Sequence, residues 1–141
     1  MVPSNYLRTY RNNAVLTASP GQLVLMLYDG ALRALDSVIE GFARPETDYR
    51  RLEAINRGLL KANAILGELR GNLDLVAGGD VAKSLADLYD FYIRHLEQAN
   101  FLKDMQRVLD VQRLLQQLRD GWAEMLVKGQ TESSGQLVRT A

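Results

Sequence analysis

The stretch from Ser19 to Glu40 constrains the fold most, because it has the pattern of one helix that is apolar around most of its circumference. Ser19 is a suitable N-cap, Pro20 occupies the tolerated first helical position, and Gln22 completes a capping box. At about 100° per residue the apolar side chains fill an arc of about 220°, whereas a helix facing one core needs little more than about 100°. Two explanations stay open: neighbouring helices bury the whole arc, or a partner covers part of it.

Turn signals divide the chain into four helical segments and no β-type alternation competes with them. We expect helices over about residues 20–42, 48–73, 81–100 and 105–127. Asp80 and Asp104 are the expected N-caps of the third and fourth helices. Because the connections are short, neighbouring helices should be antiparallel. The prediction is an all-α, antiparallel four-helix bundle at residues 19–127, with a short N-terminal arm at 1–18 and a disordered C-terminal tail at 128–141.

The four helices differ in how much of their surface is apolar. The second and fourth each carry one narrow seam: Leu52, Ile55, Leu59, Ala62, Leu66, Leu69 and Leu73, and then Val108, Val111, Leu115, Leu118, Trp122 and Met125. The third combines a core face (Val81, Leu85, Leu88, Tyr92, Leu96, Ala99) with a shoulder (Ala82, Ala86, Tyr89, Ile93). In an up-down-up-down bundle the first and third helices are diagonal, so their surplus faces would form two separate strips. Such strips favour either self-association or a long partner that wraps around the bundle, unless neighbouring helices bury them.

The N-terminal arm has an aromatic face of its own. Tyr6, Leu7 and Tyr10 would share one side of a short helical turn, and tyrosines prefer sites with one apolar and one wet side. The arm is either a piece of chain packed on the bundle or a displaceable flap over a partner's strip.

Charge and composition exclude several classes of function. Seventeen basic residues balance 17 acidic ones, and no local cluster supplies the basic footprint of a nucleic-acid-binding protein. The longest apolar run, from Leu23 to Tyr28, is far shorter than the roughly 20 residues that span a bilayer. The absence of cysteine suits a reducing cytosol. We expect no nucleic-acid partner and no membrane insertion.

No catalytic or cofactor-binding constellation occurs either. The only histidine, His95, lacks the setting of a phosphotransfer histidine, and Glu97 nearby would repel a phosphoryl group. A di-iron bundle needs Glu-x-x-His motifs, which are missing. Gly78-Gly79-Asp80 lacks the lysine and the spacing of a phosphate-binding loop. We therefore expect a protein that is not an enzyme and uses no metal or cofactor.

Over about residues 4–127 the sequence resembles the flagellar secretion chaperone family, FliS. The longest matching run extends from Ala18 to Leu32. Shorter matches follow the family's order and spacing: Tyr6, Lys61-Ala62 with Ile65 and Glu68-Leu69, Leu73-Asp74 with Gly78-Gly79, Leu85 with Leu88-Tyr89-Asp90, and Leu118-Arg119 with Trp122.

The resemblance implies a cytoplasmic chaperone that binds the C-terminal segment of flagellin, blocks its premature polymerisation and assists its delivery to the flagellar export apparatus. On helical-wheel grounds we expect the partner to contact Val24, Tyr28, Leu32, Tyr89 and Ile93, and Tyr6, Leu7 and Tyr10 to cover part of that surface beforehand. Export-gate components and other flagellar regulators are further possible partners. The alternative is a self-associating structural or adaptor bundle, so the chain is expected to be a monomer or a weak homodimer.

Overall fold

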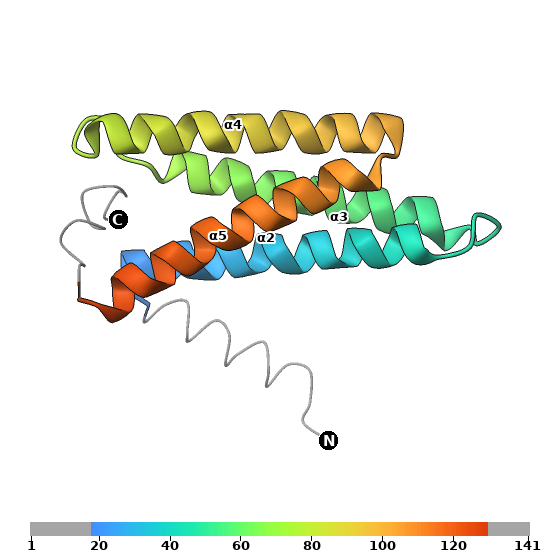
Figure 1. Cartoon of the computed structure of the whole chain (residues 1–141), viewed down its shortest axis with the longest axis horizontal. Coiled ribbons are helices and arrows are strands. Elements are labelled where there is room, and N and C mark those ends of the chain that lie inside the picture. Colours follow the sequence, from blue (N-terminus) through green and yellow to red (C-terminus); the bar gives the residue numbers. More distant parts are fainter. Residues whose placement is uncertain (1–17, 130–141) are drawn as a thin grey trace, which may run out of the picture.

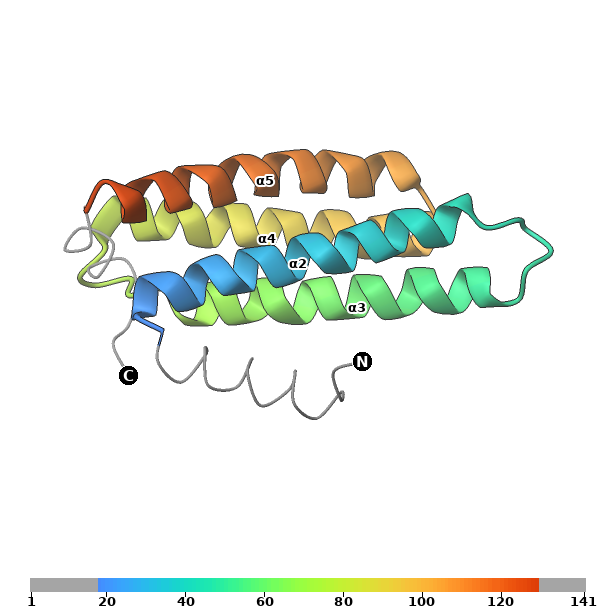
Figure 2. The same cartoon turned by 90° about the horizontal axis from the view of Figure 1, so that it is seen from below.

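The computed structural model describes residues 18–129, which form a bundle of four helices (Figure 1). The helices are α2 (Pro20–Ala43), α3 (Arg50–Gly71), α4 (Gly79–Leu102) and α5 (Met105–Val127). Successive helices run in opposite directions, as Figures 1 and 2 both show. The all-α, antiparallel four-helix prediction is confirmed, and each boundary lies within a few residues of the expected one.

The order of packing around the bundle follows the order of the chain. α2 packs on α3 and α5, and α4 packs on the same two helices, so α2 and α4 are diagonal as expected. α2 and α3 approach closely because small residues line their contact. A Cβ atom added to Gly58 would lie 2.5 Å from Cγ2 of Val38 and 3.1 Å from the carbonyl oxygen of Ala34.

Two of the three predicted helix caps are present. At the start of α2, the N–H of Gln22 donates to Oγ of Ser19 (3.2 Å) and the N–H of Ser19 donates to Oε1 of Gln22 (3.0 Å). At the start of α5, the N–H of Gln106 donates to Oδ1 of Asp104 (3.0 Å). The Asp80 cap is wrong, because α4 begins earlier, after Gly78. Asp80 lies instead in the first turn, where its charge favours the positive end of the helix dipole.

The core contains the predicted seams with three exceptions. Leu52, Val81 and Leu88, all expected inside, are exposed, Val81 by 58%. α4 is rotated about its axis relative to the prediction. It buries Ala82, Ala86 and Tyr89, which were assigned to the shoulder, together with Tyr92, Leu96 and Ala99. Both arcs of α4 are apolar, and the one with alanines packs inward because small side chains let the neighbouring helices approach.

The N-terminal arm and most of the C-terminal tail fall outside the described residues. None of the helices in residues 18–129 combines the length and apolar character that a membrane crossing requires.

Candidate functional site

The side chains expected to contact a partner lie mostly inside the bundle. Val24, Tyr28, Leu32 and Tyr89 are buried, the two tyrosines to 1% and 2% exposure, and Ile93 is partly buried. Of the two explanations left open for these apolar arcs, burial by neighbouring helices holds for these four side chains, and their contact with a partner stays a prediction. α2 needs its wide apolar arc because α3 and α5 flank it and Tyr89 of diagonal α4 meets it across the core. Tyr6, Leu7 and Tyr10 lie outside the described residues.

A pair of hydroxyl groups joins the diagonal helices at the centre of the core. The hydroxyl oxygens of Tyr28 and Tyr89 are 2.5 Å apart, and the ring centroids are 6.4 Å apart and tilted by 54°. Burial raises the pKa of both phenols, and for Tyr89 the neighbouring Tyr28 raises the pKa further. Both hydroxyls therefore stay neutral at physiological pH and satisfy each other.

α5 crosses the bundle obliquely: it starts beside α4 and ends beside α2 (Figure 1). Near its C-terminal end, Nε1–H of Trp122 donates to the carbonyl oxygen of Gly21 (2.8 Å). One turn earlier, Nε of Arg119 pairs with Oδ1 of Asp29 (2.8 Å). These two contacts hold this half of α5 on α2, away from α4.

The polar contacts between α4 and α5 lie at the other end of the pair. Nε2 of His95 is 3.6 Å from Oδ2 of Asp110, and Nη1 of Arg107 donates to Oε1 of Gln98 (2.8 Å). Among residues 18–129 no hydrogen bond or ion pair joins the first half of α4 to α5. The two helices separate towards the start of α4 (Figure 1).

This separation leaves an apolar cleft of about 270 Å³, which we call the α4–α5 groove. Val81 and Leu85 of α4 form one wall, and Leu118, Trp122 and Met125 of α5 form most of the other. Gln117 and Gly121 also line it, and Tyr28 of α2 lies at its floor. The groove thus has apolar walls and access from solvent, the usual features of a site for a partner's apolar side chains.

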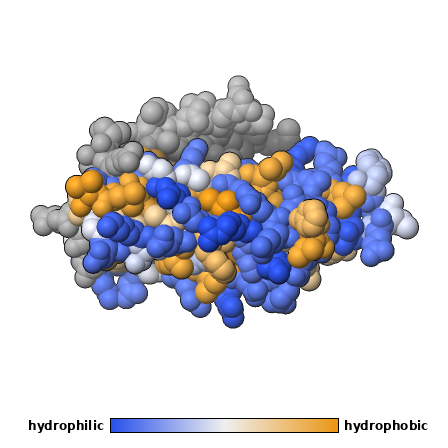
Figure 3. Space-filling view, turned by 90° about the horizontal axis from the view of Figure 1, so that it is seen from above, coloured by the Kyte–Doolittle hydropathy of each residue, from blue (hydrophilic) through white to orange (hydrophobic). Residues whose placement is uncertain are grey.

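Exposed apolar residues continue along α4 beyond the groove. Leu88 is partly exposed and Phe91 is 44% exposed, with its ring stacked on His95 at a centroid distance of 5.2 Å. Seen from the side of α4, the surface carries separate apolar patches among hydrophilic residues (Figure 3). Three exposed residues of α4 are candidate contacts that were not predicted from the sequence: Val81, Leu88 and Phe91. Their signal was the second apolar arc of α4, which periodicity alone assigned to the core.

The described part of the chain offers little for other chemistry. Residues 18–129 contain no group of three or more His, Cys, Asp or Glu side chains placed to hold a metal ion. The one polar network that includes His95 consists of interhelical contacts to α5, as described above.

Comparisons with known proteins give a consistent result. The family model described as "Flagellar protein FliS" matches residues 3–129. The "Flagellar secretion chaperone FliS" of Salmonella typhimurium is 36% identical over 130 residues, which cover 92% of this chain and 93% of that protein. The protein of the same name from Bacillus subtilis is 30% identical and covers 96% of both chains. That of Vibrio cholerae is 32% identical and covers 85% of each.

Proposed function

This chain belongs to the FliS family of flagellar proteins, and from that premise we propose that it is a cytosolic export chaperone for flagellin. It binds the C-terminal segment of flagellin, prevents premature polymerisation and assists secretion through the flagellar export apparatus. Its relatives carry the name of secretion chaperones, which supports a role in binding rather than in catalysis.

The α4–α5 groove is the observation that carries this proposal. An apolar side chain of the flagellin segment enters between Val81 and Met125 and reaches the floor at Tyr28. Burial of apolar surface stabilises such a complex by about 25 cal/mol per Å², reduced by the cost of ordering the segment. Leu88 and Phe91 extend the contact along α4.

The earlier candidate contacts take different parts in this proposal. Tyr28 meets the partner at the groove floor, and partly buried Ile93 offers a contact on the other flank of α4, where its carbonyl oxygen lies 3.5 Å from Nδ2 of Asn63 on α3. Val24, Leu32 and Tyr89 are buried and do not line the groove, so we assign them a supporting role in the core.

Titration calorimetry with a flagellin C-terminal segment tests the proposal. We expect saturable binding by the wild type and at least tenfold weaker binding by the Val81→Asp/Leu88→Asp variant. The two substitutions put one carboxylate in the groove wall and one beside the groove on α4, where each would face apolar surface of the partner. Leu52→Asp/Leu60→Asp is the matched control: both residues are exposed leucines on α3, away from the groove. Circular dichroism verifies that all variants keep their helicity.

The outcomes separate the two classes of function. Absence of wild-type binding would reject flagellin as the partner and favour the self-associating bundle, which sedimentation of the protein alone would reveal as a dimer. Equal loss of binding in both variants would place the contact elsewhere. Tyr6→Ala/Tyr10→Ala in the same titration tests the proposed flap: an altered affinity supports it, and an unchanged affinity removes it.

A further inference from the structure

A second surface lies on α2 and α3, on the opposite side of the bundle from the α4–α5 groove. Two adjoining clefts, of about 420 Å³ and about 190 Å³, run along this face and share Ala54 and Arg57 in their walls. We call them together the cationic groove, because arginine and lysine side chains form its rim. Figure 2 shows the two helices side by side on this face.

The middle of the cationic groove is shallow and lined by small residues. Ala34, Ala54 and Gly58 line it, and the absence of a side chain at Gly58 lets the backbone of α3 approach Ala34 of α2. A ligand can therefore come close to the helix backbones while long side chains surround it on both sides. Such a floor suits a peptide segment better than a single bulky apolar side chain.

The larger cleft carries cations without a described partner. Arg33 and Lys61 are exposed at its rim, and within residues 18–129 neither the guanidinium of Arg33 nor the ammonium of Lys61 makes a hydrogen bond or an ion pair. The third cation, Arg57, pairs with Glu53 one turn earlier on α3. Because these three positive groups come from two helices, no cluster in the linear sequence reveals them.

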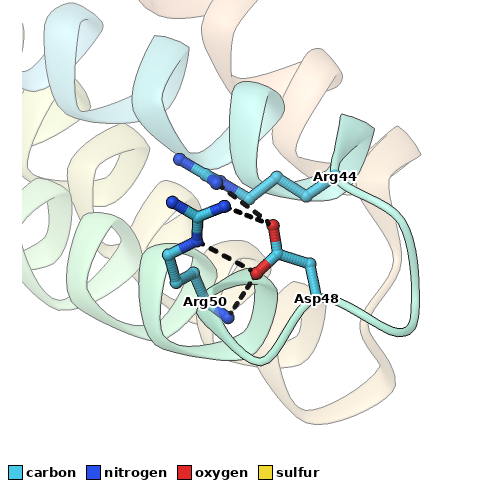
Figure 4. Close-up of polar contacts among 3 residues, drawn as sticks. All are labelled: Arg44, Asp48 and Arg50. Atoms are coloured by element: carbon cyan, nitrogen blue, oxygen red, sulfur yellow. Dashed lines mark hydrogen bonds and ion pairs between the residues drawn. The ribbon is translucent and has the colours of Figure 1, made fainter.

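Two arginines that line the smaller cleft, Arg44 and Arg50, both pair with the carboxylate of Asp48 (Figure 4). Oδ2 of Asp48 lies 3.3 Å from Nη1 of Arg44 and 3.1 Å from Nη2 of Arg50. The hydrogen bonds from Arg50 are the main reason that the pKa of Asp48 falls to about 2. A guanidinium group has five N–H donors, so Arg44 and Arg50 each keep donors that Asp48 does not use and that another carboxylate could accept from.

The charges of the groove do not balance, although those of the chain do. Five cations line the two clefts, and Glu53 is the acidic residue in their lining. With the adjacent Asp48, which pairs with Arg44 and Arg50, two carboxylates stand against them, which leaves a surplus of three positive charges. The whole chain has a formal net charge of zero. The positive surplus is therefore a local feature of the face formed by α2 and α3, where it attracts an anionic partner.

We propose that the cationic groove binds an acidic helical segment of a second protein, whose carboxylates pair with Arg33, Lys61 and Arg57. From Arg33 to Arg44 the rim extends about 16 Å along the helix axis, which is about three helical turns. Glutamates at four-residue spacing on one face of a helix would match this length. Because the α4–α5 groove lies on the far side of the bundle, an acidic segment in the cationic groove leaves the α4–α5 groove itself open.

Fluorescence anisotropy with a defined probe tests this proposal on the full-length protein. The probe is a labelled, alanine-rich helical peptide with a glutamate at every fourth position, and its counterpart has glutamine at the same positions. We expect saturable binding of the glutamate peptide that weakens as salt rises, because exposed ion pairs are screened. The Arg33→Glu/Lys61→Glu variant should bind it at least tenfold more weakly.

The matched control reverses the same kinds of charge elsewhere. Lys83→Glu/Arg94→Glu changes one exposed lysine and one exposed arginine on α4, and it should leave peptide binding unchanged. Equal weakening by both variants would show a general effect of net charge and overturn the proposal. Equal binding of the glutamine peptide, or displacement of the glutamate peptide by a single-stranded oligonucleotide at equimolar concentration, would overturn it as well.

Discussion

At the scale of single residues, the hydrogen bond between Tyr28 and Tyr89 matters most, because it is polar and lies in the middle of an apolar core. Within residues 18–129, neither hydroxyl has another hydrogen-bond partner. Each ring also packs against the opposite helix, so the pair fixes how α2 and α4 lie across the core. Removal of one hydroxyl group should therefore leave the other without a hydrogen-bond partner in the core.

We predict that Tyr28→Phe and Tyr89→Phe each lower the free energy of unfolding by about 1–3 kcal/mol, because each leaves a buried hydroxyl unpaired. The double variant should cost much less than the sum of the two, since it removes both polar groups. Urea denaturation of the four proteins measures this coupling. Additive effects would show that the two hydroxyls do not depend on each other.

The second residue-scale prediction concerns Asp48 and acid. Its pKa is lowered from 3.8 to about 2 in the folded protein, so its contribution to stability is present above pH 3.8 and is lost as the pH falls towards 2. Thermal unfolding across this range should show wild type and Asp48→Asn converging as the pH falls. A difference that stays constant from pH 6 to pH 2 would contradict the assignment.

At the scale of elements, close contact between α2 and α3 depends on the absence of a side chain at position 58. The atoms that a Cβ would meet include the carbonyl oxygen of Ala34, which cannot move without the helix. The same closeness gives the cationic groove its shallow floor. Packing between α2 and α3 therefore determines the shape of the cationic groove as well as the stability of the bundle.

We predict that Gly58→Ala lowers the free energy of unfolding by about 1–3 kcal/mol through overpacking. Gly67→Ala, on the same helix, is the control: a Cβ there meets nothing within 4 Å, so alanine should stabilise the protein by about 0.5–1 kcal/mol. Opposite signs in chemical denaturation would support the close contact. Stabilisation by both substitutions would show that α2 and α3 tolerate a wider separation.

At the scale of the whole molecule, the sequence predicted the four helices, their antiparallel order and the diagonal placement of α2 and α4. Local signals carry these features: the capping box at Ser19, the cap at Asp104 and the spacing of the leucine seams. The rotation of α4 was not predictable in this way, because Val81 and Ala82 begin two apolar arcs of similar width. Which of the two arcs faces the core depends on how the neighbouring helices pack against α4.

The two surfaces were also beyond sequence reasoning, for a related reason. The α4–α5 groove depends on contacts between residues far apart in the chain, above all Trp122 with Gly21. The cationic groove requires Arg33 of α2 to lie beside Lys61 of α3. Periodicity describes one helix at a time, whereas each of these surfaces is formed by two helices packed side by side.

The position of Trp122 has a practical consequence. It is the only tryptophan in the chain, and it stands in the wall of the α4–α5 groove with its indole N–H fixed to Gly21. All tryptophan emission from the protein therefore originates at that wall. Filling of the groove can be followed by intrinsic fluorescence without any label, provided that the ligand itself carries no tryptophan.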